Sequence, residues 1–95
     1  MAPKTPKPTL PSSFQLAGFD WAVVYRADLS EYGRCDPNTQ TIFIREGMNE
    51  QLTQQTFFHE LVHAVMFAMG QTNHDEVFTD AFGSLLHQFD KSKAY

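Results

Sequence analysis

The chain has 95 residues, 42% of them hydrophobic, which is enough for one small domain with a single compact core. A formal net charge of −4 argues against a nucleic-acid-binding surface, and no apolar run approaches the roughly 20 residues of a membrane span. The single cysteine, Cys35, excludes a disulfide within the chain. We therefore expect a cytoplasmic domain without membrane or nucleic-acid partners.

The N-terminal segment is predicted to be a flexible tail. Residues 1–13 hold four of the five prolines, with lysine, threonine and serine between them. A proline-rich ligand for an SH3-like partner is the alternative interpretation of this spacing. The folded domain is then expected over residues 14–90, with a short C-terminal tail at residues 91–95.

The first half of the domain has the pattern of short β-strands. Residues 14–16 and 19–26 are rich in β-forming side chains and are separated by a turn that contains glycine. Turn-forming residues follow, and residues 41–45 then alternate at period two, with Ile42 and Ile44 on one face. The pattern predicts a small antiparallel sheet of three or four strands.

The second half has the pattern of two helices. Asn49 can cap a helix that begins at Glu50, and Gly70 is a natural stop after it. Asn73 is the expected cap of a second helix that runs to about Phe89. A sheet followed by two helices belongs to the α+β class.

The second helix carries two different stripes at helical spacing. The stripe expected to face the core consists of Phe78, Ala81, Phe82, Leu85 and Phe89. The other stripe is polar and includes a glycine, at which a second helix or a ligand could approach closely; it consists of Glu76, Asp80, Gly83 and His87.

The first helix contains the HExxH pattern, His59-Glu60-Leu61-Val62-His63. Histidines four residues apart lie on one helix face, about 6 Å apart along the axis, so both can bind one Zn²⁺. Glu60, beside the first histidine, can act as general base on a metal-bound water. The HExxH pattern rarely occurs by chance in so short a chain, which argues against the alternative that His59 and His63 are two ordinary surface histidines.

A catalytic zinc site needs a third protein ligand, with water in the fourth position. The longer HExxHxxGxxH motif is absent, because methionines replace its glycine and its third histidine. The remaining candidates are Glu76, Asp80, His87 and His74. The short connection from His63 to Glu76 leaves the geometry open, since only a steep crossing of the two helices brings Glu76 to the metal. Asn73 and Glu76 could also form a capping box, which would occupy that carboxylate.

HExxH followed by Glu76-x-x-x-Asp80 resembles the gluzincins, the thermolysin-like zinc peptidases. Over roughly residues 30–90 the chain is also similar to the small ImmA/IrrE-like peptidases and to the minigluzincins of phage and prophage genomes. The resemblance implies that His59, His63 and Glu76 bind Zn²⁺ and that Asp80 orients a ligating histidine. A site completed by His87 would instead resemble the SprT-type zinc proteins.

The implied activity is hydrolysis of a peptide bond in a protein or peptide substrate, in a narrow regulatory or phage-related role. The substrate is expected to pair with a sheet edge, for which residues 41–45 are the candidate strand. The group that stabilises the oxyanion is one of four candidates: Tyr25, Tyr32, Arg34 or His74.

Two other interpretations remain. One is a non-catalytic zinc-binding interaction module, which Glu60 argues against, because a purely structural site has no use for a base. The other is a metal-free helical hairpin on a sheet. Cys35 could mask the zinc as a thiolate, although a lone cysteine in a strand is more often simply packed.

Overall fold

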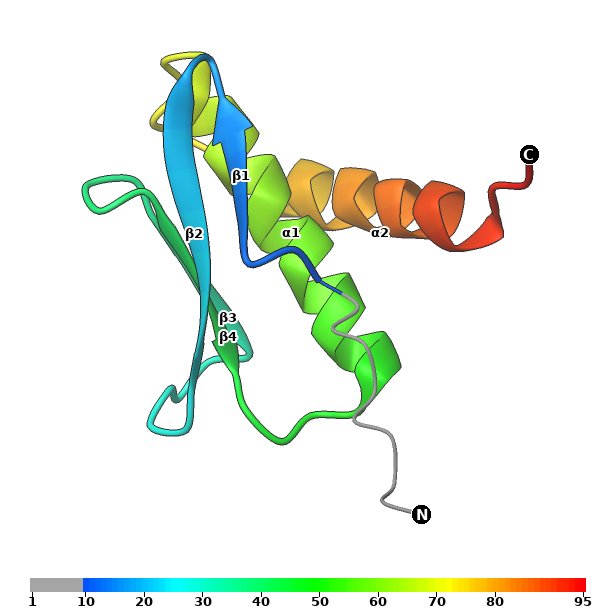
Figure 1. The fold of residues 1–95 in the computed structure, drawn as a ribbon. Helices are drawn as coiled ribbons and strands as arrows, with labels where there is room; N and C mark the ends of the chain where they lie inside the picture. Colours follow the sequence, from blue (N-terminus) through cyan, green and yellow to red (C-terminus); the bar gives the residue numbers. More distant parts are fainter. Residues whose placement is uncertain (1–9) are drawn as a thin grey trace.

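The computed structural model describes residues 10–95 and has the predicted α+β architecture, a small sheet followed by two helices (Figure 1). Its elements are β1 (Ser13–Leu16), β2 (Phe19–Arg26), β3 (Gly33–Asp36), β4 (Thr41–Arg45), α1 (Glu50–Ala68) and α2 (Glu76–Ser92). Neither helix of this described part has the length and hydropathy that a membrane span requires.

The domain is longer at both ends than the sequence predicted. Leu10 is buried in the core and Ser13 begins β1, so the last residues of the expected N-terminal tail belong to the fold. The rest of that tail, including its proline pattern before Leu10, lies outside the described residues. At the other end α2 continues to Ser92, past the expected boundary at residue 90.

The sheet is mixed rather than purely antiparallel. Its strand order is β1-β2-β4-β3; β1 pairs with β2 and β3 with β4 in antiparallel fashion, whereas β2 and β4 run parallel. The short, polar strand β3 takes the edge, and β4, with Ile42 and Ile44 fully buried, takes an interior position. An apolar strand that is paired on both sides shields more surface from water than it would at an edge, which explains this order.

The position of β4 corrects one expectation about the substrate. Residues 41–45 are paired on both sides and cannot offer a free edge, so β3 is the free edge beside α1. β3 lies tight against α1: a Cβ atom on Gly33 would approach Thr56 Cγ2 to 2.6 Å and Glu60 Cγ to 3.1 Å. The glycine therefore allows the edge strand to lie directly beside the HExxH helix.

α1 begins and ends close to where the sequence predicts. The side chain of Asn49 accepts a hydrogen bond from the backbone N–H of Leu52, at 2.8 Å, and Gly70 follows the end of the helix with a positive φ of 84°. α1 packs on β3 and β4, with Phe57 and Ala64 in the shared core. This packing holds the HExxH turn against the edge of the sheet.

α2 starts two residues later than expected, because Asp75 and not Asn73 is its cap. The Asp75 carboxylate accepts hydrogen bonds from the backbone N–H groups of Val77 and Phe78, at 2.9 and 3.4 Å. An aspartate can satisfy two free N–H groups and also interacts favourably with the helix dipole. The capping box of Asn73 and Glu76 does not form, which leaves the Glu76 carboxylate free for another role.

The orientation of α2 overturns the prediction that its aromatic stripe faces the core. Its buried residues are Thr79, Gly83 and His87, which pack on α1, whereas Phe78, Phe82, Leu85 and Phe89 are exposed, as is Ala81. A Cβ atom on Gly83 would lie 3.0 Å from the Cα atom of His59, so the backbones meet closely there. Small residues permit this close crossing, and large apolar residues at the contact would prevent it.

Candidate metal centre

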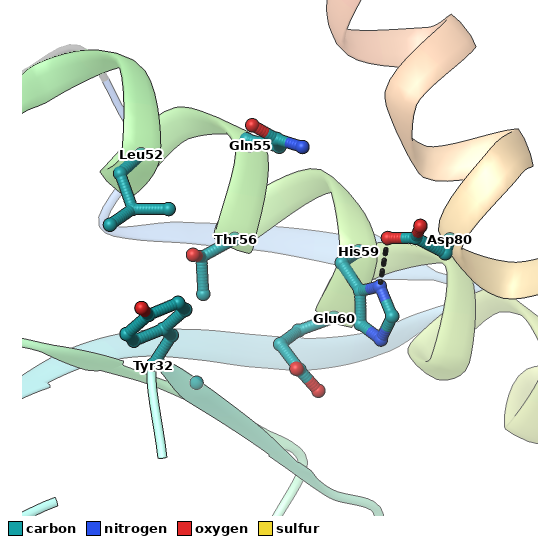
Figure 2. Close-up of a pocket in the computed structure, with 8 residues that line it drawn as sticks. Tyr32, Leu52, Gln55, Thr56, His59, Glu60 and Asp80 are labelled. Atoms are coloured by element: carbon teal, nitrogen blue, oxygen red, sulfur yellow. Dashed lines mark ion pairs between the residues drawn. The ribbon is translucent and has the colours of Figure 1, made fainter. Parts of the chain in front are cut away.

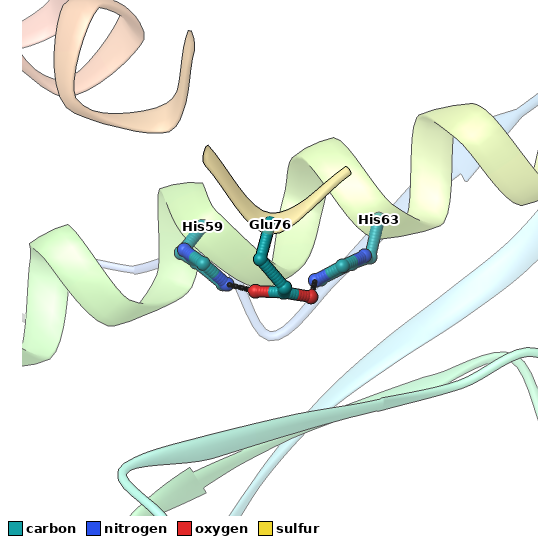
Figure 3. A group of neighbouring side chains, drawn as sticks. All are labelled: His59, His63 and Glu76. Atoms are coloured by element: carbon teal, nitrogen blue, oxygen red, sulfur yellow. Dashed lines mark ion pairs between the residues drawn. The ribbon is translucent and has the colours of Figure 1, made fainter. Parts of the chain in front are cut away.

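One turn of α1 brings the two motif histidines to the same side, opposite the start of α2. The ring centroids of His59 and His63 lie 5.1 Å apart. The Glu76 carboxylate lies between the rings, with Oε2 3.3 Å from His59 Nε2 and Oε1 3.1 Å from His63 Nε2 (Figure 3). The steep crossing of α2 over α1 thus brings Glu76, first of the candidate third ligands, to the two histidines.

The arrangement of these three side chains fits a tetrahedral metal ion. Each offers one ligand atom, and these atoms all lie within 4.8 Å of one another. Ligand atoms around a tetrahedral zinc, with bonds of about 2.0–2.1 Å, are about 3.3–3.4 Å apart. The separations of 3.1 and 3.3 Å between carboxylate oxygens and imidazole nitrogens are close to that value. Each involves a different oxygen of the Glu76 carboxylate, so a small turn of this side chain would place one oxygen on a metal shared with both histidines. Two imidazoles and one carboxylate are also a donor set that zinc accepts, with a fourth position left over.

Asp80 lies behind His59, on the side away from Glu76. Asp80 follows Glu76 by one helical turn on the same face of α2. Its Oδ1 atom is 3.6 Å from Nδ1 of His59 (Figure 2). At this distance the carboxylate faces the imidazole nitrogen that a metal would leave free. This is the position that the resemblance implied for Asp80, and it is not the position of a third ligand.

His74 contacts the other motif histidine, a role that the sequence did not indicate. The Nδ1 atoms of His63 and His74 are 2.7 Å apart, and Nε2 of His74 is 2.6 Å from the carbonyl oxygen of Gln71. A carbonyl oxygen only accepts, so His74 Nε2 carries the hydrogen and its Nδ1 is the acceptor. A neutral His63 therefore donates from Nδ1 and keeps its lone pair on Nε2, where a metal ion shared with Glu76 would bind.

Burial supports the neutral form of His63. Its pKa is lowered below the ordinary value of 6.5, mainly because the surroundings exclude water, with His59 and His74 adding to the effect and Glu76 opposing it. Neutral imidazole is the form that binds a metal ion. The pocket thus keeps this histidine ready for coordination near neutral pH.

Glu60 lies beside the cluster and is itself buried, with 8% of its surface exposed. Burial raises its pKa from 4.5 to about 7; His59 opposes the shift, and Glu76 and Glu31 add to it. A carboxyl group with a pKa near the working pH can both accept and return a proton. Such a shifted group next to a possible metal site is typical of a catalytic base.

Two cavities meet at Glu60 and share Gly33 and His59 as lining residues. The first, of about 340 Å³, also contacts Tyr32 and Asp80 (Figure 2). The second, of about 570 Å³, extends past the histidine and carboxylate cluster to His74, Arg34 and Cys35 on β3. Together they form a cleft along the free edge of β3, with the candidate metal centre in its middle.

His87 is not part of the cluster. Its Nε2 atom is 3.1 Å from Oε1 of Gln54, and its ring stacks on Phe58 with centroids 5.6 Å apart. The hydrogen bond satisfies a buried imidazole where α2 packs on α1, so His87 has a structural role there. Of the candidate third ligands, Glu76 alone reaches both motif histidines.

The four candidate oxyanion groups occupy different surroundings. Tyr32 and Arg34 line the cleft, but Arg34 forms an ion pair with Glu31 at 2.8 Å. His74 is already bonded to His63, and Tyr25 lies on β2 away from the residues that line the cleft. Tyr32 is thus the hydroxyl best placed to reach a substrate beside Glu60.

Cys35 lines the cleft but packs partly against the core. Burial, with smaller contributions from Glu60 and Asp36, raises the pKa of its thiol to about 12. The packing of Cys35 against the core favours the packed interpretation over the masking one.

Comparison of the chain with protein-family models, with curated proteins and with solved structures found no match.

Proposed function

We propose that the chain is a small gluzincin-type zinc metallopeptidase that hydrolyses a peptide bond in a protein or peptide substrate. The observation that carries the proposal is the convergence of His59 and His63 on the Glu76 carboxylate, beside the buried Glu60. The same chemistry was expected from HExxH alone, but the position of Glu76 supports a three-ligand site with an open position.

A zinc ion held by these three residues would supply a Lewis acid for the scissile carbonyl and an acidified water. Glu60 accepts the proton of the attacking water and returns it to the amine that leaves. Its raised pKa suits both halves of this transfer, because neither protonation state is strongly favoured near neutral pH.

The surrounding residues favour the tautomers that a metal requires. His74 accepts from Nδ1 of a neutral His63, and the Asp80 carboxylate, 3.6 Å from Nδ1 of His59, favours a proton there by its charge, so both Nε2 atoms would keep their lone pairs for the metal. Such outer contacts also fix the ring planes and thereby limit the movement of the ligands.

The free edge of β3 supports an extended peptide as the substrate. A peptide that lies in the cleft can pair its backbone with β3 while the scissile bond faces Glu60. The hydroxyl of Tyr32 then lies on the cleft wall as a donor for the developing oxyanion. We place this activity in the cytoplasm, as expected from the lone Cys35, and in a narrow regulatory role, since so short a chain builds few pockets.

The decisive experiment compares the wild-type chain with the Glu60→Gln variant. Both are loaded with zinc, their metal content is measured, and they are incubated with a mixed peptide library whose cleavage is followed by mass spectrometry. We expect about one zinc per chain in both proteins and a loss of cleavage of ~10²-fold or more in the variant. The Glu46→Gln variant changes an exposed carboxylate away from the cleft and serves as the matched control.

A second candidate is a zinc-binding interaction module without catalysis. The large apolar side chains exposed on α2, among them Phe78, Leu85 and Phe89, favour this alternative, because such a surface is typical of an interaction site. Zinc binding with equal peptide turnover in wild type and Glu60→Gln would support the module and reject the peptidase. Metal content far below one per chain would reject both.

A further inference from the structure

The outer face of α2 carries an apolar stripe that nothing in the described structure covers. It consists of Phe78, Phe82, Leu85 and Phe89, which are 51%, 44%, 69% and 67% exposed. The C-terminal half of α2 extends beyond α1 and away from the sheet (Figure 1). Large apolar residues gathered on one exposed helix face mark an interaction surface.

The spacing of the stripe is that of a helix-packing seam. Its residues follow one another at intervals of four, three and four, so they form one row along the helix. The flank on the side away from α1 is free of charge and consists of Ala81, Ser84, Gln88 and Ser92. Phe78 and Phe82 already stack, with ring centroids 5.5 Å apart, so part of the surface is ordered in advance.

This seam is complementary to itself. When two copies of α2 lie antiparallel about a two-fold axis between residues 83 and 84, Phe82 of one copy faces Leu85 of the other. Phe78 then faces Phe89 at each end of the contact. A two-fold axis requires such a self-complementary patch, and closed two-fold dimers are the commonest assemblies of soluble chains.

The exposed area agrees with a weak dimer. With ~200 Å² for a whole phenylalanine side chain, the stripe leaves on the order of 400 Å² of apolar surface in water. Two copies bury about twice this amount, and the uncharged flank adds polar area, which approaches the ~1,200 Å² of the smaller specific interfaces. We expect dissociation constants in the micromolar range for such a contact.

The charges on α2 argue against a lipid membrane as the binding partner of the apolar stripe. Helices that bind membranes carry lysines and arginines beside the apolar face, whereas α2 contains three acidic residues, Glu76, Asp80 and Asp90, and one lysine, Lys91. The net charge of the chain, −4, would also be repelled by anionic lipids.

We propose that this stripe is the interface of a homodimer in which the α2 helices of two copies pack antiparallel, with Phe82 of one copy against Leu85 of the other. Glu76 and Asp80 lie on the opposite face of α2, towards α1, so the dimer leaves the candidate metal centre open. Formation of the dimer is therefore independent of the enzymatic activity.

Sedimentation velocity over a range from ~1 to ~300 μM tests the dimer in the full chain. We expect a concentration-dependent dimer for the wild type and a monomer for Leu85→Glu, whose two carboxylates would meet near the axis and weaken association by at least ~100-fold. Gln51→Glu adds a negative charge at an exposed position of α1, outside the stripe and its flank, and should leave the dimer intact. Circular dichroism checks that each variant is folded.

A mixing experiment tests the register. Phe82→Lys should also be monomeric, but an equimolar mixture with Leu85→Glu should form a heterodimer, because lysine and glutamate then face each other across the axis. If the wild-type chain remains monomeric over the whole concentration range, the proposal is wrong. Binding of that monomer to anionic vesicles would then identify the stripe as a lipid-binding surface. A Leu85→Glu variant that still dimerises places the interface elsewhere, and a mixture that stays monomeric rejects the antiparallel register.

Discussion

The Nδ1 atoms of His63 and His74 lie 2.7 Å apart, and His74 is bonded in turn to the carbonyl of Gln71. This chain of contacts starts at a candidate metal ligand and ends on the backbone of the turn between the helices. The turn therefore does more than connect α1 to α2, because it also orients His63.

Removal of this contact should weaken metal binding. We expect His74→Phe, which keeps an aromatic ring against His63 but offers no acceptor, to lower zinc affinity by ~10–100-fold. His74→Gln retains an acceptor oxygen and should recover part of the loss. Titration against a chelator of known affinity measures both variants, and equal affinity for wild type and His74→Phe would show that the contact does not tune His63.

Loss of the third ligand should have a larger effect than loss of an outer contact. Glu76→Gln should reduce zinc affinity by more than the ~10–100-fold expected for Asp80→Asn, because Glu76 supplies a charged ligand atom and Asp80 faces only the far side of His59. The Asp90→Asn variant changes an exposed carboxylate on the same helix and should have no effect. If Asp80→Asn proves the more damaging of the two, their roles are reversed.

The close crossing at Gly83 should be sensitive to a single methyl group. A Cβ atom there would lie 3.0 Å from the Cα atom of His59, so Gly83→Ala should push α2 outward and destabilise the metal-free chain by about 1–3 kcal/mol. Zinc affinity should fall as well, since Glu76 moves with the helix. Ser84→Ala, at the exposed neighbouring position, is the control in denaturant unfolding. A Gly83→Ala variant with wild-type stability and affinity would mean that the helices can shift without cost.

The buried Glu60 should make the stability of the metal-free chain depend on pH. Its pKa is 4.5 in the unfolded reference and about 7 in the folded chain, so between these values the folded state binds more protons. The free energy of unfolding should therefore fall as pH rises from about 4.5 to about 7, by on the order of 3 kcal/mol from this group.

Unfolding in urea at a series of pH values, with a chelator present, measures this effect. In Glu60→Gln the fall should disappear, and the variant should exceed the wild type in stability at pH 8. His63 contributes in the opposite direction, because its lowered pKa removes stability at low pH, but it is present in both proteins and largely cancels in their difference. Parallel pH curves for the two proteins would contradict a raised pKa at Glu60.

Local patterns in the sequence predicted the positions of the strands and helices and the HExxH part of the candidate metal site. The alternation around Ile42 and Ile44 predicted a half-buried strand, and Asn49 and Gly70 predicted the limits of α1. The spacing of His59 and His63 placed both imidazoles on one helix face. These features depend on residues a few positions apart, and backbone geometry alone relates such residues.

Features that depend on distant segments were decided by the tertiary structure. The sequence did not reveal that β4 lies parallel to β2, that Asp75 caps α2, or that His74 contacts His63. Strand order and helix caps depend on which of several competing folded arrangements buries more apolar surface. A local sequence pattern does not show how much surface each arrangement would bury.

The orientation of α2 shows the limit most clearly. By periodicity its aromatic stripe should face the core, yet Gly83 and Thr79 pack on α1 and the stripe faces solvent. The backbones of two helices can meet closely only where side chains are small, and this crossing is also the one that brings Glu76 to His59 and His63. The sequence by itself thus determined which side chains could form a metal site, and the helix crossing decided which of them meet.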